Sequence, residues 1–144
     1  MKKLAVLAAL GFCIAIAGCK DPYGGCAKAG ADIAQGVSTG LATVASLQQQ
    51  GEITSAEALN VAGYLEFVNK GDEAFLSCVQ TAHINGNKPG TYTACTATFN
   101  TTLNTPAELA LVKVGNATAS ATINTIVTGF STAVTLIQTQ LGGA

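Results

Sequence analysis

Cysteine is the residue type in this chain with the widest choice of chemistry, and the 144 residues include five of them. Three, Cys26, Cys78 and Cys95, lie in the body of the chain and could form a disulfide, a metal site or a reactive thiol. A thiol redox centre needs Cys-x-x-Cys, which the sequence lacks. The spacing from Cys78 to His83 does not match zinc-binding motifs. We therefore expect one disulfide and neither a metal site nor a cofactor.

Catalytic sets are missing from the sequence. The only histidine, His83, lies next to a predicted loop, and no serine occurs in a nucleophile-elbow motif. Glu66 and Glu73 lie on one face of a predicted helix, with Lys70 between them. That arrangement indicates surface ion pairs rather than a catalytic acid and base. We therefore predict that the protein is not an enzyme.

The N-terminal residues have the pattern of a secretory signal. Lys2 and Lys3 precede an apolar run over residues 4–17, which is followed by small residues and then an abrupt polar segment. The apolar run is shorter than the roughly 20 residues that a membrane-spanning helix needs. The sequence therefore predicts a signal helix rather than a permanent membrane span.

This signal ends in Ile16-Ala17-Gly18-Cys19, which resembles the lipobox of bacterial lipoproteins. The resemblance implies that the Cys19 thiol receives a diacylglycerol and that cleavage removes residues 1–18 as a signal peptide. Residues 19–25 would then be the lipidated cysteine and a short tether. The alternative is an ordinary signal peptide in which Cys19 is a plain cysteine. Lys20 directly after Cys19, where Asp would retain a lipoprotein in the inner membrane, favours the outer membrane.

Residues 19–144 have the size of one domain and carry five lysines, eight acidic residues and no arginine. This charge balance excludes a nucleic-acid binder, which needs a basic surface. Charged residues make up 10% of the chain, well below the usual quarter, and none follows Lys113. The uncharged C-terminal segment is either the central helix of the fold or a surface that meets another protein, another copy or the membrane.

Apolar residues at alternating steps of three and four predict four helices in residues 26–144. The first spans about residues 26–49. The second begins with a capping box at Thr54 and Glu57 and stays in phase to Ala82, with a kink allowed near Gly71.

A loop over residues 84–90 separates these helices from a short third helix over about residues 92–103. Thr105 and Pro106 then open a last helix that continues to Gly142. Helices that each carry one apolar stripe and are joined by short loops predict an all-α fold. We expect an up-down four-helix bundle with one short helix, which follows the N-terminal signal helix.

An up-down bundle brings Cys26, Cys78 and Cys95 together at the end nearest the anchor. We favour a Cys78–Cys95 disulfide, because both residues flank one loop on neighbouring helices. A disulfide between Cys26 and Cys78 fits the predicted bundle nearly as well and remains an alternative.

Together these features predict a non-enzymatic lipoprotein of the bacterial cell envelope. It would be held by lipid on Cys19 to the periplasmic face of the membrane and would act through contact with an envelope protein or with itself. Two alternatives remain, a lipoprotein that binds lipid or a small molecule, and an immunity or phage-exclusion lipoprotein.

Overall fold

The computed structural model describes residues 21–142, so the predicted signal peptide and Cys19 lie outside the described residues. Within residues 21–142 the chain is helical and contains no β-strand. The elements are α1 (Pro22–Gln49), α2 (Ser55–Ile84), α3 (Pro89–Leu103), α4 (Pro106–Leu109), a 3-10 turn (Ala110–Val112) and α5 (Ala117–Gly142). The predicted all-α fold is confirmed.

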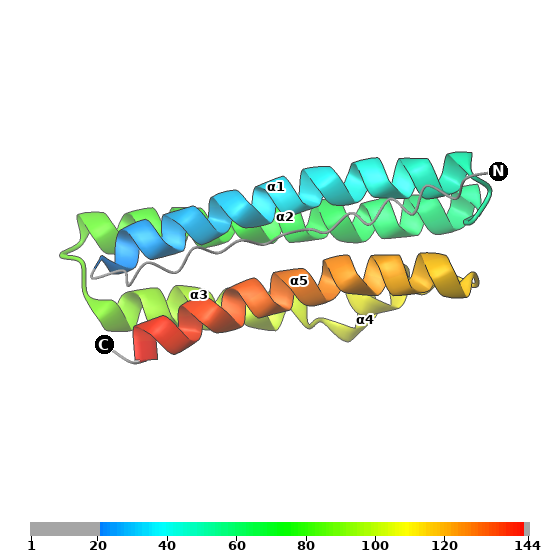
Figure 1. Cartoon of the computed structure of the whole chain (residues 1–144). Coiled ribbons are helices and arrows are strands. Elements are labelled where there is room, and N and C mark those ends of the chain that lie inside the picture. Colours follow the sequence, from blue (N-terminus) through cyan, green and yellow to red (C-terminus); the bar gives the residue numbers. More distant parts are fainter. Residues whose placement is uncertain (1–20, 143–144) are drawn as a thin grey trace.

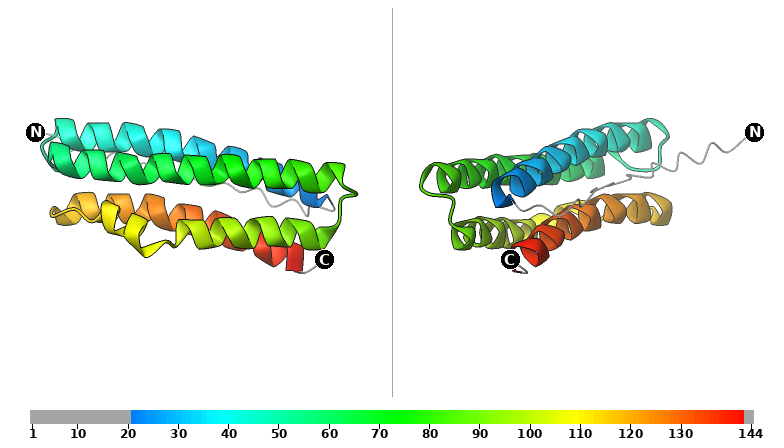
Figure 2. Two further views of the ribbon diagram at one scale, coloured as in Figure 1. Left: turned by 180° about the vertical axis from the view of Figure 1, so that it is seen from behind. Right: turned by 60° about the vertical axis from the view of Figure 1, so that its left-hand side comes forward.

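The long helices run antiparallel in two layers, with α1 and α2 in one layer and α3 and α5 in the other (Figures 1 and 2). Contacts join α1 to α2, α2 to α3, α3 to α5 and α5 back to α1. The third arm of the bundle consists of α3 followed by α4 and the 3-10 turn (Figure 1). The predicted up-down four-helix bundle is therefore confirmed.

Local capping residues set where the first two helices begin. The Asp21 carboxylate accepts hydrogen bonds of 3.1 Å from the backbone N–H groups of Tyr23 and Gly24, and Pro22 takes the first helical position. Helix α1 therefore begins before the expected start at Cys26. Helix α2 begins with the predicted capping box: Glu57 N donates to the Thr54 hydroxyl at 3.2 Å, and Thr54 N donates to the Glu57 carboxylate at 2.8 Å.

Glycine lets the helices approach closely where the layers meet. A Cβ on Gly40 would lie 3.1 Å from the terminal methyl carbons of Leu65 and 3.5 Å from Cγ2 of Ile126. Gly40 and Gly36 are both buried in α1. The small-residue face of α1 is thus packed inside the bundle against α2 and α5. Side chains with 0–1% exposure at the centre of the core include Ile33, Tyr64, Leu65, Val68, Leu103, Ile123, Phe130 and Val134.

We expected one helix from Pro106 to Gly142, and this was wrong. The chain leaves helical geometry after Val112, and α5 begins after Asn116, whose side-chain Oδ1 accepts from Ala119 N at 3.0 Å. A continuous helix over residues 106–142 would be about 55 Å long, whereas the 30 residues of α2 span about 45 Å. The break places residues 106–112 in the third arm and lets α5 match its neighbours in length.

The Glu57 side chain is hydrogen-bonded to the loop at this break. Its Oε2 belongs to the capping box of α2, and its Oε1 accepts a 2.7 Å hydrogen bond from the backbone N–H of Gly115. The carboxylate therefore joins the start of α2 to the loop before α5. Hydrogen bonds from the Thr54 and Gly115 backbone, and from the Thr54 hydroxyl, lower the pKa of Glu57 below its ordinary value of 4.5.

Replacing Glu57 by Ala is expected to speed amide hydrogen exchange at Thr54 and Gly115 and to lower the urea midpoint of unfolding. The contribution of Glu57 should fade as pH falls through its lowered pKa, because the protonated carboxyl is a weaker acceptor. Residue-resolved exchange of the wild type and of Glu57→Ala measures this effect. Glu66→Ala, on the exposed side of the same helix, is the control and should leave both amides protected. Equal exchange in all three proteins would contradict the proposed role of Glu57.

Candidate functional site

The three cysteines of the domain lie at the end of the bundle where α1 begins, the tether end. Cys78 on α2 and Cys95 on α3 form a disulfide with a Cα–Cα distance of 5.8 Å, within the usual range. Cys26 on α1 is fully buried. The pair formed is the one favoured from the sequence. It joins the two layers directly beside the loop over residues 85–88.

Aromatic side chains brace the same end. The rings of Tyr23 on α1 and His83 on α2 stack with their centroids 4.0 Å apart, and the Tyr23 hydroxyl donates to Gln80 Oε1 at 2.8 Å. Tyr92 is fully buried, and its hydroxyl donates to Asn87 Oδ1 in the α2–α3 loop. The Tyr23 contacts hold the first turn of α1 against the end of α2, and the Tyr92 hydrogen bond holds α3 to the α2–α3 loop.

His83 lies exposed in the last turn of α2, as the sequence predicts. It does not join the cysteines in a shared site, because its ring faces Tyr23 and two of the cysteines are in the disulfide. Over residues 21–142 no group of three or more His, Cys, Asp or Glu side chains is placed to hold a metal ion.

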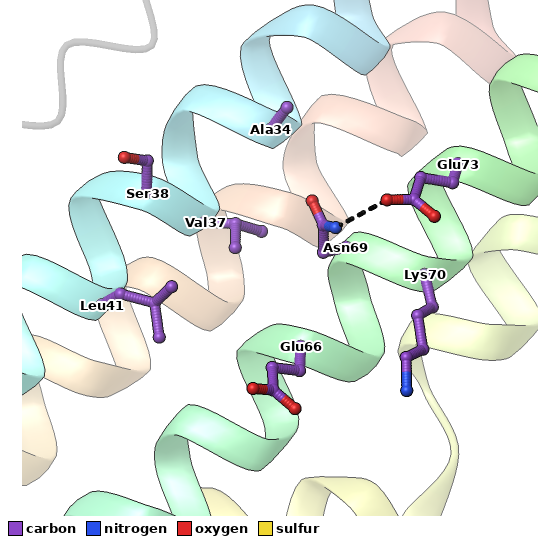
Figure 3. Close-up of a pocket in the computed structure, with 8 residues that line it drawn as sticks. All are labelled: Ala34, Val37, Ser38, Leu41, Glu66, Asn69, Lys70 and Glu73. Carbon is purple, nitrogen blue, oxygen red and sulfur yellow. Dashed lines mark hydrogen bonds between the residues drawn. The ribbon is translucent and has the colours of Figure 1, made fainter.

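An open groove of about 400 Å³ lies between α1 and α2 (Figure 3). Its α1 side carries Val37 and Leu41, and Leu41 is 39% exposed. Its α2 side is polar, and Asn69 donates to the Glu73 carboxylate at 3.0 Å. The lining residues are Ala34, Val37, Ser38, Leu41, Glu66, Asn69, Lys70 and Glu73. An apolar wall opposite a charged wall suits an amphipathic small molecule.

The carboxyl side chain of Asp72 on α2 is buried in the core with 2% exposure. It occupies the inward stripe of α2 between Val68 and Phe75, and its Oδ1 has no hydrogen-bond partner among the described residues. Burial, and to a smaller degree the negative charge of Glu73, raises the pKa of Asp72 from 3.8 to about 7. The core therefore favours the protonated carboxyl over the carboxylate.

Helix α5 is, by length and composition, apolar enough to cross a membrane, with a mean hydropathy of 1.3 over its best window. Its apolar residues lie on the inward side, where Ile123, Ile126 and Phe130 are buried, and it packs against α1 and α3. The outward side carries threonine and alanine. In the bundle α5 is one of the four arms, and about a third of this window is buried.

The sequence placed the cysteines and His83 correctly. The ion pairs expected between Lys70 and the acids Glu66 and Glu73 are not formed: Glu73 accepts a hydrogen bond from Asn69, and the salt bridge found among the described residues is Lys28–Asp32 on α1.

Two further features of the site were missed. The groove depends on the outward sides of two helices and has no local signal. Asp72 did have one, because it is the only charged residue in an apolar stripe of α2. A charge at a heptad core position is itself a reason to expect a shifted pKa.

No protein-family model, curated protein or solved structure matches this chain.

Proposed function

We propose that the protein is a non-enzymatic lipoprotein of the bacterial cell envelope. Lipid on Cys19 would hold it to the periplasmic face of the membrane, in the outer membrane by the identity of Lys20, and it would act through contact with other protein. The observation that carries this proposal is Ile16-Ala17-Gly18-Cys19 at the end of a basic-then-apolar leader.

The arrangement of the tether end supports an anchor at Cys19. Asp21 caps α1, so the helix begins three residues after the proposed lipid site. Two or more acyl chains provide stable attachment, and so short a link would keep the bundle close to the bilayer. The disulfide and the Tyr23–His83 stack lie at this same end. A disulfide also suits the oxidising compartment that such a leader implies.

Replacing Cys19 by Ala is expected to block signal cleavage and to abolish incorporation of labelled palmitate, because the thiol that accepts the lipid is gone. Cys13→Ala is a matched control, since Cys13 lies in the same leader and would be removed with it. It should leave processing and labelling as in the wild type. Metabolic labelling and membrane fractionation in a bacterial host measure both. Normal maturation of Cys19→Ala, or a wild type without label, would contradict the proposal.

A further inference from the structure

The loop between α2 and α3 is the outermost part of the tether end. Figures 1 and 2 show that it projects beyond the start of α1 and the end of α5. Residues 83–91, which we call the tip, are all exposed. The tip includes one large apolar side chain: Ile84, the last residue of α2, is 71% exposed.

The backbone of the loop holds Ile84 in this exposed position. Gly86 has a φ of 105°, and the turn that it forms lets Asn87 N donate to Ala82 O at 3.0 Å. The Tyr92 hydroxyl donates to the Asn87 side chain and joins the loop to α3. These hydrogen bonds fix the backbone on both sides of the loop, so the Ile84 side chain stays outside the bundle.

The proposed lipid site lies beside this tip. The rings of Tyr23 and His83 stack, so the first turn of α1 is level with the last turn of α2. One residue separates Asp21 from Cys19, and two peptide steps reach no more than about 7 Å. An acylated Cys19 would therefore hold the tip at the level of the lipid headgroups. A lone exposed apolar residue is common on protein surfaces, and it is this position that identifies lipid as the partner of Ile84.

The charges of the tip also suit a bilayer. Residues 74–107 contain no Asp or Glu. Lys88 is exposed in the loop, and a lysine close to an anionic bilayer is attracted to it. The carboxylate of Asp21, at the same end, already accepts two backbone N–H groups. An anionic lipid surface would therefore attract Lys88 and meet little opposing charge at the described residues of this end.

We infer that the tip docks on the lipid bilayer, with Ile84 inserted at the boundary between headgroups and acyl chains and with Lys88 at the phosphates. The bundle then stands on the membrane on its tether end. The inference rests on the proposed function, because it needs the lipid on Cys19, and it deepens that function by naming the surface that the folded domain contacts. The opposite end of the bundle, about 45 Å away along α2, is presented to the periplasm for protein contact.

A tryptophan introduced at the tip tests this contact, because the chain has no tryptophan of its own. Ile84→Trp places the probe at the tip. Leu59→Trp is the matched control, because Leu59 is on the same helix and is 74% exposed. It lies about 37 Å along the helix from Ile84. Both variants carry the same preference of tryptophan for membrane interfaces, so a difference between them reports position.

The full mature lipoproteins are placed in vesicles of phosphatidylethanolamine and phosphatidylglycerol, with and without lipid that is brominated on its acyl chains. Bromine quenches tryptophan fluorescence only at close range. Circular dichroism verifies that each variant is folded. Flotation and intact mass report whether each protein is bound to the vesicles and acylated.

Ile84→Trp is expected to emit at shorter wavelength than Leu59→Trp and to lose intensity in brominated vesicles, whereas Leu59→Trp should not respond to bromine. Equal quenching of the two variants would mean that the bundle lies along the membrane. Ile84→Trp without quenching would mean that water or, if its emission is still shifted, protein surrounds the tip. Either result overturns the inference and leaves the anchor intact. Protein that carries no acyl mass and does not float with the vesicles overturns the proposed function and the inference together.

Discussion

Replacing Asp72 by Asn is expected to flatten the pH dependence of stability. From pH 4 to pH 8 the free energy of unfolding of the wild type should fall by about 4 kcal/mol relative to that of the variant. The folded wild type keeps the Asp72 proton until about pH 7, because the carboxyl is buried. The unfolded chain releases it near 3.8. Between these values the unfolded state binds fewer protons, so rising pH favours unfolding. Above about pH 7 both states have released the proton, so the free energy of unfolding no longer changes with pH through Asp72.

Urea unfolding followed by circular dichroism at pH values from 4 to 8 measures this effect. The amide introduced by Asp72→Asn is itself a buried polar group, which adds an offset that does not vary with pH, so the change with pH is the decisive quantity. Glu66→Gln is the control, because Glu66 is an exposed acid on the same helix. It should follow the wild type. Parallel stability curves for Asp72→Asn and the wild type would contradict a buried, protonated Asp72.

Removal of the disulfide, by replacing both Cys78 and Cys95 with Ala, is expected to lower the free energy of unfolding by about 3 kcal/mol. The bond closes a loop with a sequence separation of 17, and opening it returns conformational entropy to the unfolded chain. The effect should be felt first at the tether end, where the bond joins α2 to α3.

Reductant provides an internal control for this variant. Dithiothreitol should lower the stability of the wild type to about that of the double variant, and it should leave the double variant unchanged. Urea unfolding with and without reductant measures both. A wild type that is insensitive to reductant, or that contains free thiols at Cys78 and Cys95, would contradict the pairing.

The helices of this fold were predictable because their signals are local. The Thr54–Glu57 capping box and the apolar stripe of α2 lie within one segment, and the structure has both. The start of α1 also had a local signal, since Asp21 and Pro22 are a typical cap and first residue. It was placed too late because the stripe of apolar residues begins only at Cys26.

The break before α5 was not predictable from periodicity. Val112, Asn116 and Ala119 remain in phase with the stripe on either side, so the pattern indicates a continuous helix. Gly115 and the capping residue Asn116 mark the break locally, and two non-local terms add to this signal: the length of the neighbouring helices and the hydrogen bond from Gly115 N to Glu57. Those partners are 58 positions apart in sequence. The groove between α1 and α2 likewise depends on two helices placed side by side, so it has no local signal in the sequence.

The intact mass of the mature protein, purified from membranes without reductant, tests the central claim most directly. We expect residues 19–144 plus the mass of the acyl groups on Cys19, less two hydrogens for the Cys78–Cys95 bond. A chain that retains residues 1–18, or one that begins elsewhere and carries no acyl mass, would contradict the account.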